Sequence, residues 1–112
     1  MQIIRGAVNE VTVTLTSNHT PTIYNITMTN ANQEYSQALP ANTKKFTVMM
    51  QENDTAFRIA YITGKVATPT APYFACPAGA CISEDFSQGK TSQTLYFACG
   101  TAGKTIQIIA WN

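Results

Sequence analysis

The sequence predicts an all-β protein, an antiparallel β-sandwich of about eight short strands, on three observations. Threonine, asparagine, glutamine and serine make up 37 of the 112 residues, and β-branched threonine suits a pleated surface that is half exposed to water. Apolar and polar residues alternate in several short runs, which is the period of a strand with one buried face. Turn residues separate the runs at intervals typical of sandwiches and barrels, and no segment has a helical period. A jelly roll is one arrangement that fits.

The first half of the chain holds the clearest alternation. Val11-Thr-Val-Thr-Leu-Thr16 is perfectly alternating, and Tyr24, Ile26 and Met28 repeat the same spacing. The expected strands are residues 11–16, 22–29, 36–39, 45–50 and 56–62. Because a polar turn at Glu52–Asp54 separates the last two, residues 46–62 are predicted to form a β-hairpin.

The second half contains a repeated tetrapeptide. Tyr-Phe-Ala-Cys occurs at residues 73–76 and again at 96–99, each time before a turn that contains glycine. We interpret the copies as two core strands with similar residues, because the flanking sequences do not match. If the two strands are neighbours, Phe74 and Phe97 pack on the same core face. The remaining expectations are strands at 81–84, 95–99 and 105–111, with a polar loop at 87–92.

The length of the chain sets the number of domains, and its net charge limits the classes of partner that it can bind. The 112 residues form one domain, in which residues 1–37 can include an N-terminal arm or an added strand. Net charge is +1 and the seven cations are dispersed, whereas nucleic-acid binding needs a dense basic face. No apolar run approaches the roughly 18 residues of a membrane span, so neither nucleic acid nor membrane is expected as a partner. No export signal is visible, so the three cysteines are expected to be thiols.

The three cysteines could take part in metal binding or in disulfide bonds. Cys76 and Cys81 have the spacing of half a zinc site, but only Cys99 and the distant His19 remain as further ligands, and a structural site needs four. A disulfide from Cys76 to either of the other cysteines stays geometrically possible. No metal ion or other cofactor is expected.

Catalytic constellations are not apparent. His19 has no acidic neighbour in sequence, and the consecutive carboxylates Glu84 and Asp85 point to opposite faces of a strand. No phosphate loop, nucleophile elbow or dinucleotide fingerprint occurs. No catalytic or cofactor-binding residue is therefore assigned, and the protein is not expected to be an enzyme.

The last strand suggests a contact surface. Trp111 shares one strand face with Ile109, while the other face is apolar as well, so the strand is either buried twice or meets another chain. Tryptophan and tyrosine are frequent at interfaces. Trp111, Tyr61 and Ile109 are the candidate subunit- or ligand-interface residues.

Several turn-and-strand motifs together resemble a known class of protein. They are Leu39–Phe46, Phe57–Tyr61, Pro77–Ala80 with Ser83–Asp85, Thr94–Phe97 and Ile108–Trp111. Over roughly residues 38–112 the chain resembles small β-sandwich structural proteins of tailed bacteriophages. The resemblance implies a virion component such as a head decoration (cement) protein, a head fibre or a tail accessory.

Of these, we expect a capsid decoration protein that stabilises the head by binding between major capsid subunits. The resemblance also implies self-association as a homotrimer, assembly in the host cytoplasm and a place on the capsid surface. The alternative is a glycan- or receptor-binding β-sandwich module on the virion surface or tail.

Overall fold

The computed structural model describes residues 20–90 and 92–112, and in that part of the chain all regular structure is β-strand. The strands are β2 (Thr22–Met28), β3 (Tyr35–Ala38), β4 (Thr43–Met50), β5 (Phe57–Ala60), β6 (Phe74–Cys76), β7 (Cys81–Lys90), β8 (Thr94–Cys99) and β9 (Lys104–Trp111). The predicted all-β fold of about eight strands is confirmed. The predicted strand at 11–16 and His19 lie outside the described residues. The described part contains no helix that is long and apolar enough to cross a membrane.

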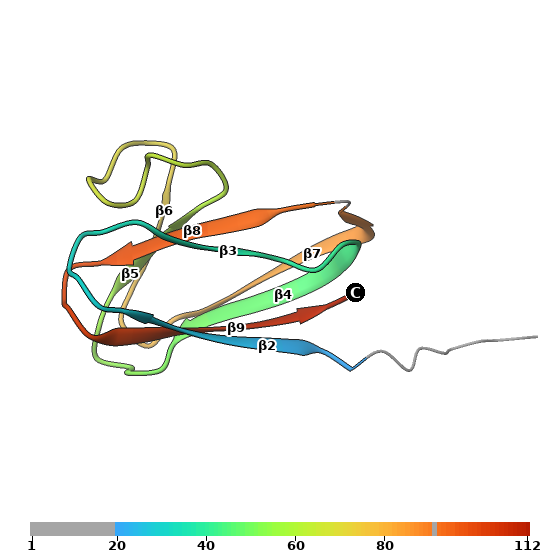
Figure 1. Ribbon diagram of the computed structural model, residues 1–112, viewed down its shortest axis with the longest axis horizontal. Helices are drawn as coiled ribbons and strands as arrows, with labels where there is room; N and C mark the ends of the chain where they lie inside the picture. The colour runs from blue at the N-terminus through green and yellow to red at the C-terminus, as the bar shows by residue number, and fades with distance from the viewer. Residues whose placement is uncertain (1–19, 91) are drawn as a thin grey trace, which may run out of the picture.

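The strands form two antiparallel four-stranded sheets, in the orders β2-β9-β4-β7 and β3-β8-β5-β6 (Figure 1). The pairs are nested: β5 pairs with β6, β4 with β7, β3 with β8, and β2 with β9. Pairs β4–β9 and β5–β8 then complete the sheets. A long double-stranded ribbon rolled up in this way is the jelly-roll form of a sandwich.

Two expectations from local sequence are wrong. β4 and β5 do not form a hairpin over residues 46–62, because they belong to different sheets and the turn between them crosses the sandwich. Residues 87–90 are not loop, because β7 continues to Lys90 and pairs with Thr43 after a register shift. β7 lies at a sheet edge, where a strand can be polar without losing its pairing to one neighbour.

The core lies between the two sheets. Every second residue is buried from Phe46 to Met50 in β4 and from Ile106 to Ala110 in β9, and these side chains pack in one cluster with those of β5 and β8. The largest fully buried side chains include Phe46, Phe57, Phe97, Met28 and Leu95. In β2, β4 and β9 the apolar residues that alternate in the sequence are therefore the ones that face the core.

The repeated tetrapeptide occupies two equivalent places in the second sheet. β6 and β8 flank β5 on opposite sides, so Phe74 and Phe97 both lie opposite Ile59. The cysteine two residues later in each copy lies opposite Phe57. The strands are not neighbours, but the two phenylalanines share a face. Phe97 is 0% exposed in the sheet interior, whereas Phe74, on the edge strand, is 55% exposed.

Candidate interaction surfaces

The first candidate surface is the solvent side of the sheet β2-β9-β4-β7, which we call the outer sheet face. It comprises Ile23, Asn25, Lys45, Thr47, Met49, Cys81, Ser83, Asp85, Gln107, Ile109 and Trp111. In β9 the core takes Ile106, Ile108 and Ala110, so Ile109 and Trp111 project from the opposite side. Ile23 lies opposite Ile109 and is 63% exposed, and Met49 is 38% exposed. Large apolar side chains are thus exposed to solvent on this face.

Polar groups on the outer sheet face bond to one another across the strands. The hydroxyl oxygens of Thr47 and Ser83 lie 2.8 Å apart, and Gln107 Nε2 donates to Asn25 Oδ1 at 3.0 Å. Groups that already have partners keep them when a second surface covers the sheet, so the penalty for burying unpaired polar atoms is small. The face can therefore be covered without a matching set of donors and acceptors on the partner.

Charged residues lie toward the two ends of this face, with Lys45 and Asp85 at one end and Glu52, which accepts from the Thr105 backbone N–H, near the other. Lys45 pairs with Trp111 on one side and with Asp85 on the other. The Lys45 ammonium lies 5.3 Å from the centre of the Trp111 ring, within the range of a cation–π contact. The central rows, through Ile109 and through Gln107, contain no charged residue.

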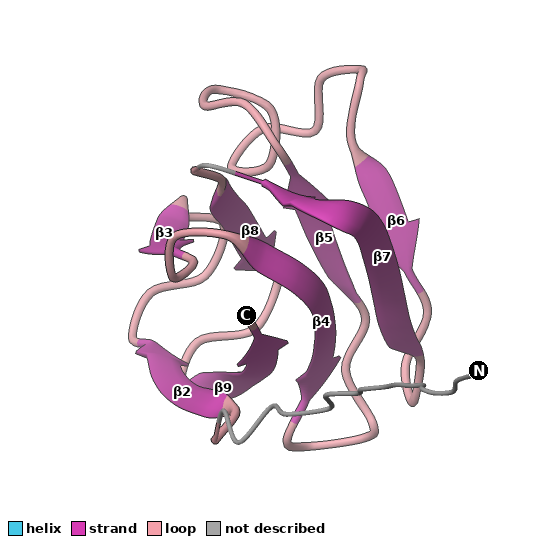
Figure 2. Cartoon of the chain, turned by 90° about the vertical axis from the view of Figure 1, so that its right-hand side faces the viewer, coloured by secondary structure: helices cyan, strands magenta, loops and turns pink. Residues whose placement is uncertain are grey.

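The second candidate surface is an apolar groove of about 490 Å³, which we call the edge groove. It opens between β6 and β7, which lie at the same side of the sandwich but in different sheets (Figure 2). Its exposed wall consists of Tyr61, Ile62, Tyr73 and Phe74, and its other wall includes Ile82 and Glu84. All four exposed residues are large and apolar or aromatic, which is unusual for a surface that meets only water.

Tyr61 belongs to the edge groove and not to the outer sheet face. Its ring meets the ring of Phe46 edge to face, with centroids 6.4 Å apart. Burial, and then the nearby Glu84 carboxylate, raise the pKa of the Tyr61 phenol above its usual value of 10.0. The phenol is therefore neutral at physiological pH and can act as a hydrogen-bond donor, while its ring supplies contact area. Of the three predicted interface residues, the structure brings Trp111 and Ile109 together and places Tyr61 elsewhere.

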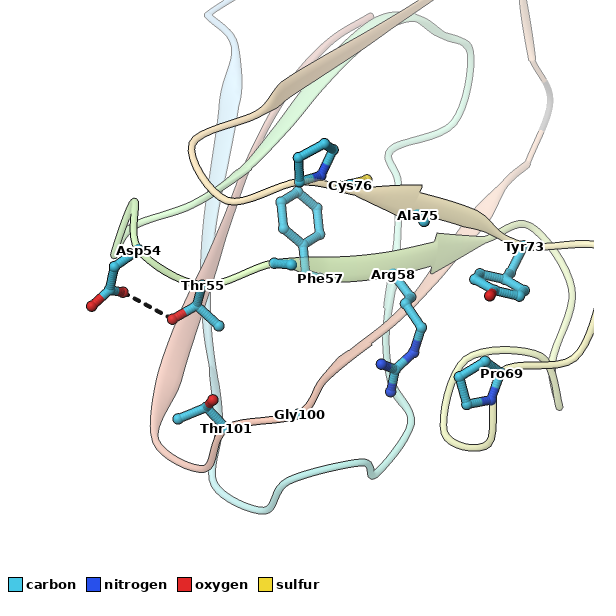
Figure 3. Close-up of a pocket in the computed structure, with 12 residues that line it drawn as sticks. Asp54, Thr55, Phe57, Arg58, Pro69, Tyr73, Ala75, Cys76, Gly100 and Thr101 are labelled. Atoms are coloured by element: carbon cyan, nitrogen blue, oxygen red, sulfur yellow. Dashed lines mark hydrogen bonds between the residues drawn. The ribbon is translucent and has the colours of Figure 1, made fainter.

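A third feature, which we call the Arg58 hollow, has a volume of about 580 Å³ and a mixed polar and apolar lining, and it lies on the other sheet beside β5 and β6 (Figure 3). In that view Arg58 lies between Asp54 and Tyr73, and small residues such as Ala75 and Gly100 leave the space open. Arg58 also holds the local loops, since its Nε donates to Val66 O at 2.7 Å and its Nη2 to Asn32 Oδ1 at 3.0 Å.

Two of the acidic groups in the described residues, Glu34 and Asp54, have structural partners. Glu34 accepts hydrogen bonds from Thr63 Oγ1 at 2.6 Å and from the Gly64 backbone N–H at 2.9 Å, which fixes the loop after β5. A hydrogen bond from Thr55, and then the charge of Lys104, hold the pKa of the exposed Asp54 carboxyl below its usual value of 3.8. Asp54 therefore stays ionised above pH 4.

The cysteines are all free, with Cys76 and Cys99 buried and Cys81 exposed. Burial raises the pKa of the Cys76 thiol to about 11, so it is not a ready nucleophile or metal ligand. Within residues 20–90 and 92–112, no three histidine, cysteine or acidic side chains lie close enough to hold a metal ion.

Sequence reasoning missed two residues of the outer sheet face, Ile23 and Met49. The signal was present, because both lie at outward positions of strands whose inward residues alternate with them. The edge groove was missed as well. It arises where two strands from different sheets end up side by side, which no local pattern encodes.

Comparison of the chain with protein-family models, with curated proteins and with solved structures finds no match. Function is therefore inferred from the sequence and the surfaces of this chain.

Proposed function

We propose that the protein is a non-enzymatic structural component of a bacteriophage virion, a capsid decoration protein that binds between major capsid subunits and stabilises the head. The observation that supports this proposal is the outer sheet face, where Ile23 and Met49 are exposed and Ile109 and Trp111 are half-buried. Such a face is suited to lie against a protein surface.

Three properties of the outer sheet face favour adhesion. Apolar burial supplies a driving force of about 25 cal/mol per Å². The cross-strand pairs Thr47–Ser83 and Asn25–Gln107 keep their hydrogen bonds when covered. The small net charge of +1 allows many copies to sit close together without strong mutual repulsion.

The size of the face favours multivalent attachment. β4 and β9 each have eight residues, so four strands present a flat area of about 400 Å² at about 3.4 Å per residue and about 4.8 Å between strands. A standard interface buries about 800 Å² on each partner. One copy thus binds weakly, and a homotrimer that engages three equivalent capsid sites gains affinity through effective concentration.

The jelly-roll strand order adds an analogy. Many viral capsid domains are built this way, although lectins and cupins share the architecture and a fold alone does not determine function. The weight of the proposal therefore rests on the face and not on the fold.

The test is binding of the purified chain to phage heads. Particles from the phage that carries the coding sequence are stripped of the chain, mixed with wild type or with Ile109→Asp, and sedimented. We expect saturable co-sedimentation of wild type and at least a ten-fold weaker affinity for the variant, because the substitution places a charge at the centre of the contact.

Ser36→Asp is the matched control, because Ser36 is exposed on β3 in the opposite sheet. It should bind like wild type, and circular dichroism should show that both variants are folded. Failure of wild type to sediment with the particles, or equal binding of the Ile109 variant, would overturn the proposal.

A glycan-binding function is a second candidate, favoured by the mixed polar and apolar lining of the Arg58 hollow. Tyr73 offers a ring for stacking on a sugar, while Arg58 and Asp54 offer charged hydrogen-bonding groups. Titration with a panel of bacterial surface glycans, followed by NMR, tests it. Saturable binding lost in Tyr73→Ala and kept in Trp111→Ala favours this candidate, whereas loss of particle attachment in Trp111→Ala favours decoration.

A further inference from the structure

We propose that the edge groove receives residues 11–16 of a neighbouring copy of the same chain, as an added strand between β6 and β7. This contact joins copies to one another, so it is independent of whether the outer sheet face binds a capsid.

The groove has the properties of a site for an extended apolar segment. Ile62 and Phe74 are both more than half exposed, and Tyr61 and Tyr73 extend the same apolar wall. β6 and β7 are the edge strands of their sheets, so each has one side without a neighbouring strand in the described part of the chain. Open strand edges beside apolar pockets are the setting in which an added strand binds through its backbone and its alternate side chains.

The segment Val11-Thr-Val-Thr-Leu-Thr16 matches these requirements. It has no charge, proline or glycine, and every second residue is a branched apolar one. In an extended conformation Val11, Val13 and Leu15 share one side, and the three threonines share the other. One side can therefore fill the groove while the other meets water. The groove wall carries Glu84, which disfavours an acidic segment and leaves a neutral one unaffected.

The short length of chain between residues 16 and 22 favours binding of residues 11–16 to the groove of a neighbouring copy over binding to the groove of the same copy. Thr22, where β2 begins, lies in the same cross-strand row as Glu84 of β7. The row runs across the sheet because Thr22 pairs with Ala110, Ala110 pairs with Phe46, and Phe46 pairs with Glu84. A strand added beside β7 is four strand spacings, or about 19 Å, from β2. The six steps from Thr22 back to Thr16 cover about 20 Å only when fully straight. The path must also rise over the side chains of the outer sheet face and turn at both ends, which uses more than this length.

The first experiment measures the mass of the full chain in solution by sedimentation equilibrium. We expect an oligomer for wild type and a monomer for Val13→Asp, which would place a charge in the apolar groove. Thr14→Asp is the matched control, with the same charge one residue along on the opposite side of the segment, and it should stay oligomeric. Unchanged circular dichroism shows that each variant is folded. A monomeric wild type at about 100 µM, or equal effects of the two variants, would overturn the proposal.

The second experiment locates the contact by oxidative cross-linking in a Cys81→Ser background, which removes the exposed thiol. One chain carries Val13→Cys, and a second chain of different mass carries Ile62→Cys. We expect a mixed disulfide at least five-fold more abundant than with Thr14→Cys in place of Val13→Cys.

A chain that carries both new cysteines separates the two possible sources of the strand. If it closes on itself at high dilution while the mixed product is missing, the segment fills its own groove and the proposal is wrong. Absence of any cross-link would also refute it. Loss of capsid binding in Ile109→Asp with oligomerisation intact would concern the decoration function alone.

Discussion

The repeated tetrapeptide allows a matched pair of substitutions, Phe97→Ala and Phe74→Ala. Both residues follow tyrosine, precede alanine and cysteine, and lie opposite Ile59 of β5. They differ in depth, because Phe97 is 0% exposed and Phe74 is 55% exposed. Any difference between the variants therefore reports the position of each strand in its sheet.

The magnitudes follow from that burial. Truncating a fully buried phenylalanine removes transfer free energy and leaves a cavity, which costs about 3–5 kcal/mol. Phe74 buries somewhat less than half of its side chain and leaves no closed cavity, so the corresponding loss is about 1 kcal/mol. We expect the free energy of unfolding to fall by about 2–4 kcal/mol more for Phe97→Ala than for Phe74→Ala.

The assay is urea denaturation followed by fluorescence of the single tryptophan, Trp111. Both substitutions are made in the Val13→Asp background, so that contact between copies does not contribute at Phe74. Equal losses for the two variants, or a larger loss for Phe74→Ala, would refute the sheet order β3-β8-β5-β6 and the depth assigned to each copy.

Three further predictions concern single contacts in the described structure. Thr43→Val leaves the Pro40 carbonyl without the Thr43 hydroxyl that donates to it at 2.6 Å, and should lower the free energy of unfolding in urea by about 1–2 kcal/mol. Glu52→Ala removes the acceptor that the Thr105 backbone N–H reaches at 3.0 Å and should cost about 1–2 kcal/mol in the same assay, whereas Glu52→Gln keeps an acceptor and should cost less. Burial raises the pKa of the Cys76 thiol from 9.0 to about 11 in the folded protein. Between pH 9 and pH 11 the thiol is therefore ionised in the unfolded chain and protonated in the folded one, so the free energy of unfolding falls as pH rises. Urea denaturation at pH 8 and at pH 10 should show that the free energy of unfolding falls less between the two pH values for Cys76→Ala than for wild type.

The sequence was sufficient for the strands whose two faces differ. In β2, β4 and β9 one side meets the core and the other meets water, so apolar residues recur at every second position. The same alternation placed Trp111 and Ile109 on one face of the last strand, where the structure has them.

What the sequence could not supply is the pairing of strands over long distances. A short polar turn between β4 and β5 looks the same whether it closes a hairpin or crosses from sheet to sheet, so the predicted hairpin was wrong. The edge groove has the same origin, because Phe74 and Ile82 line one space only after β6 and β7 have joined different sheets. The role of Tyr61 as a contact residue stays a prediction, and its separation from Trp111 is a consequence of topology.

The copy number of the chain in purified phage particles tests the central claim most directly. Quantitative mass spectrometry of intact, CsCl-banded heads gives the ratio of this chain to the major capsid protein. A decoration protein with the outer sheet face as its contact should be present at a fixed whole-number ratio to the capsid lattice, in hundreds of copies. Absence from the particles, or only a few copies per particle, would contradict the account.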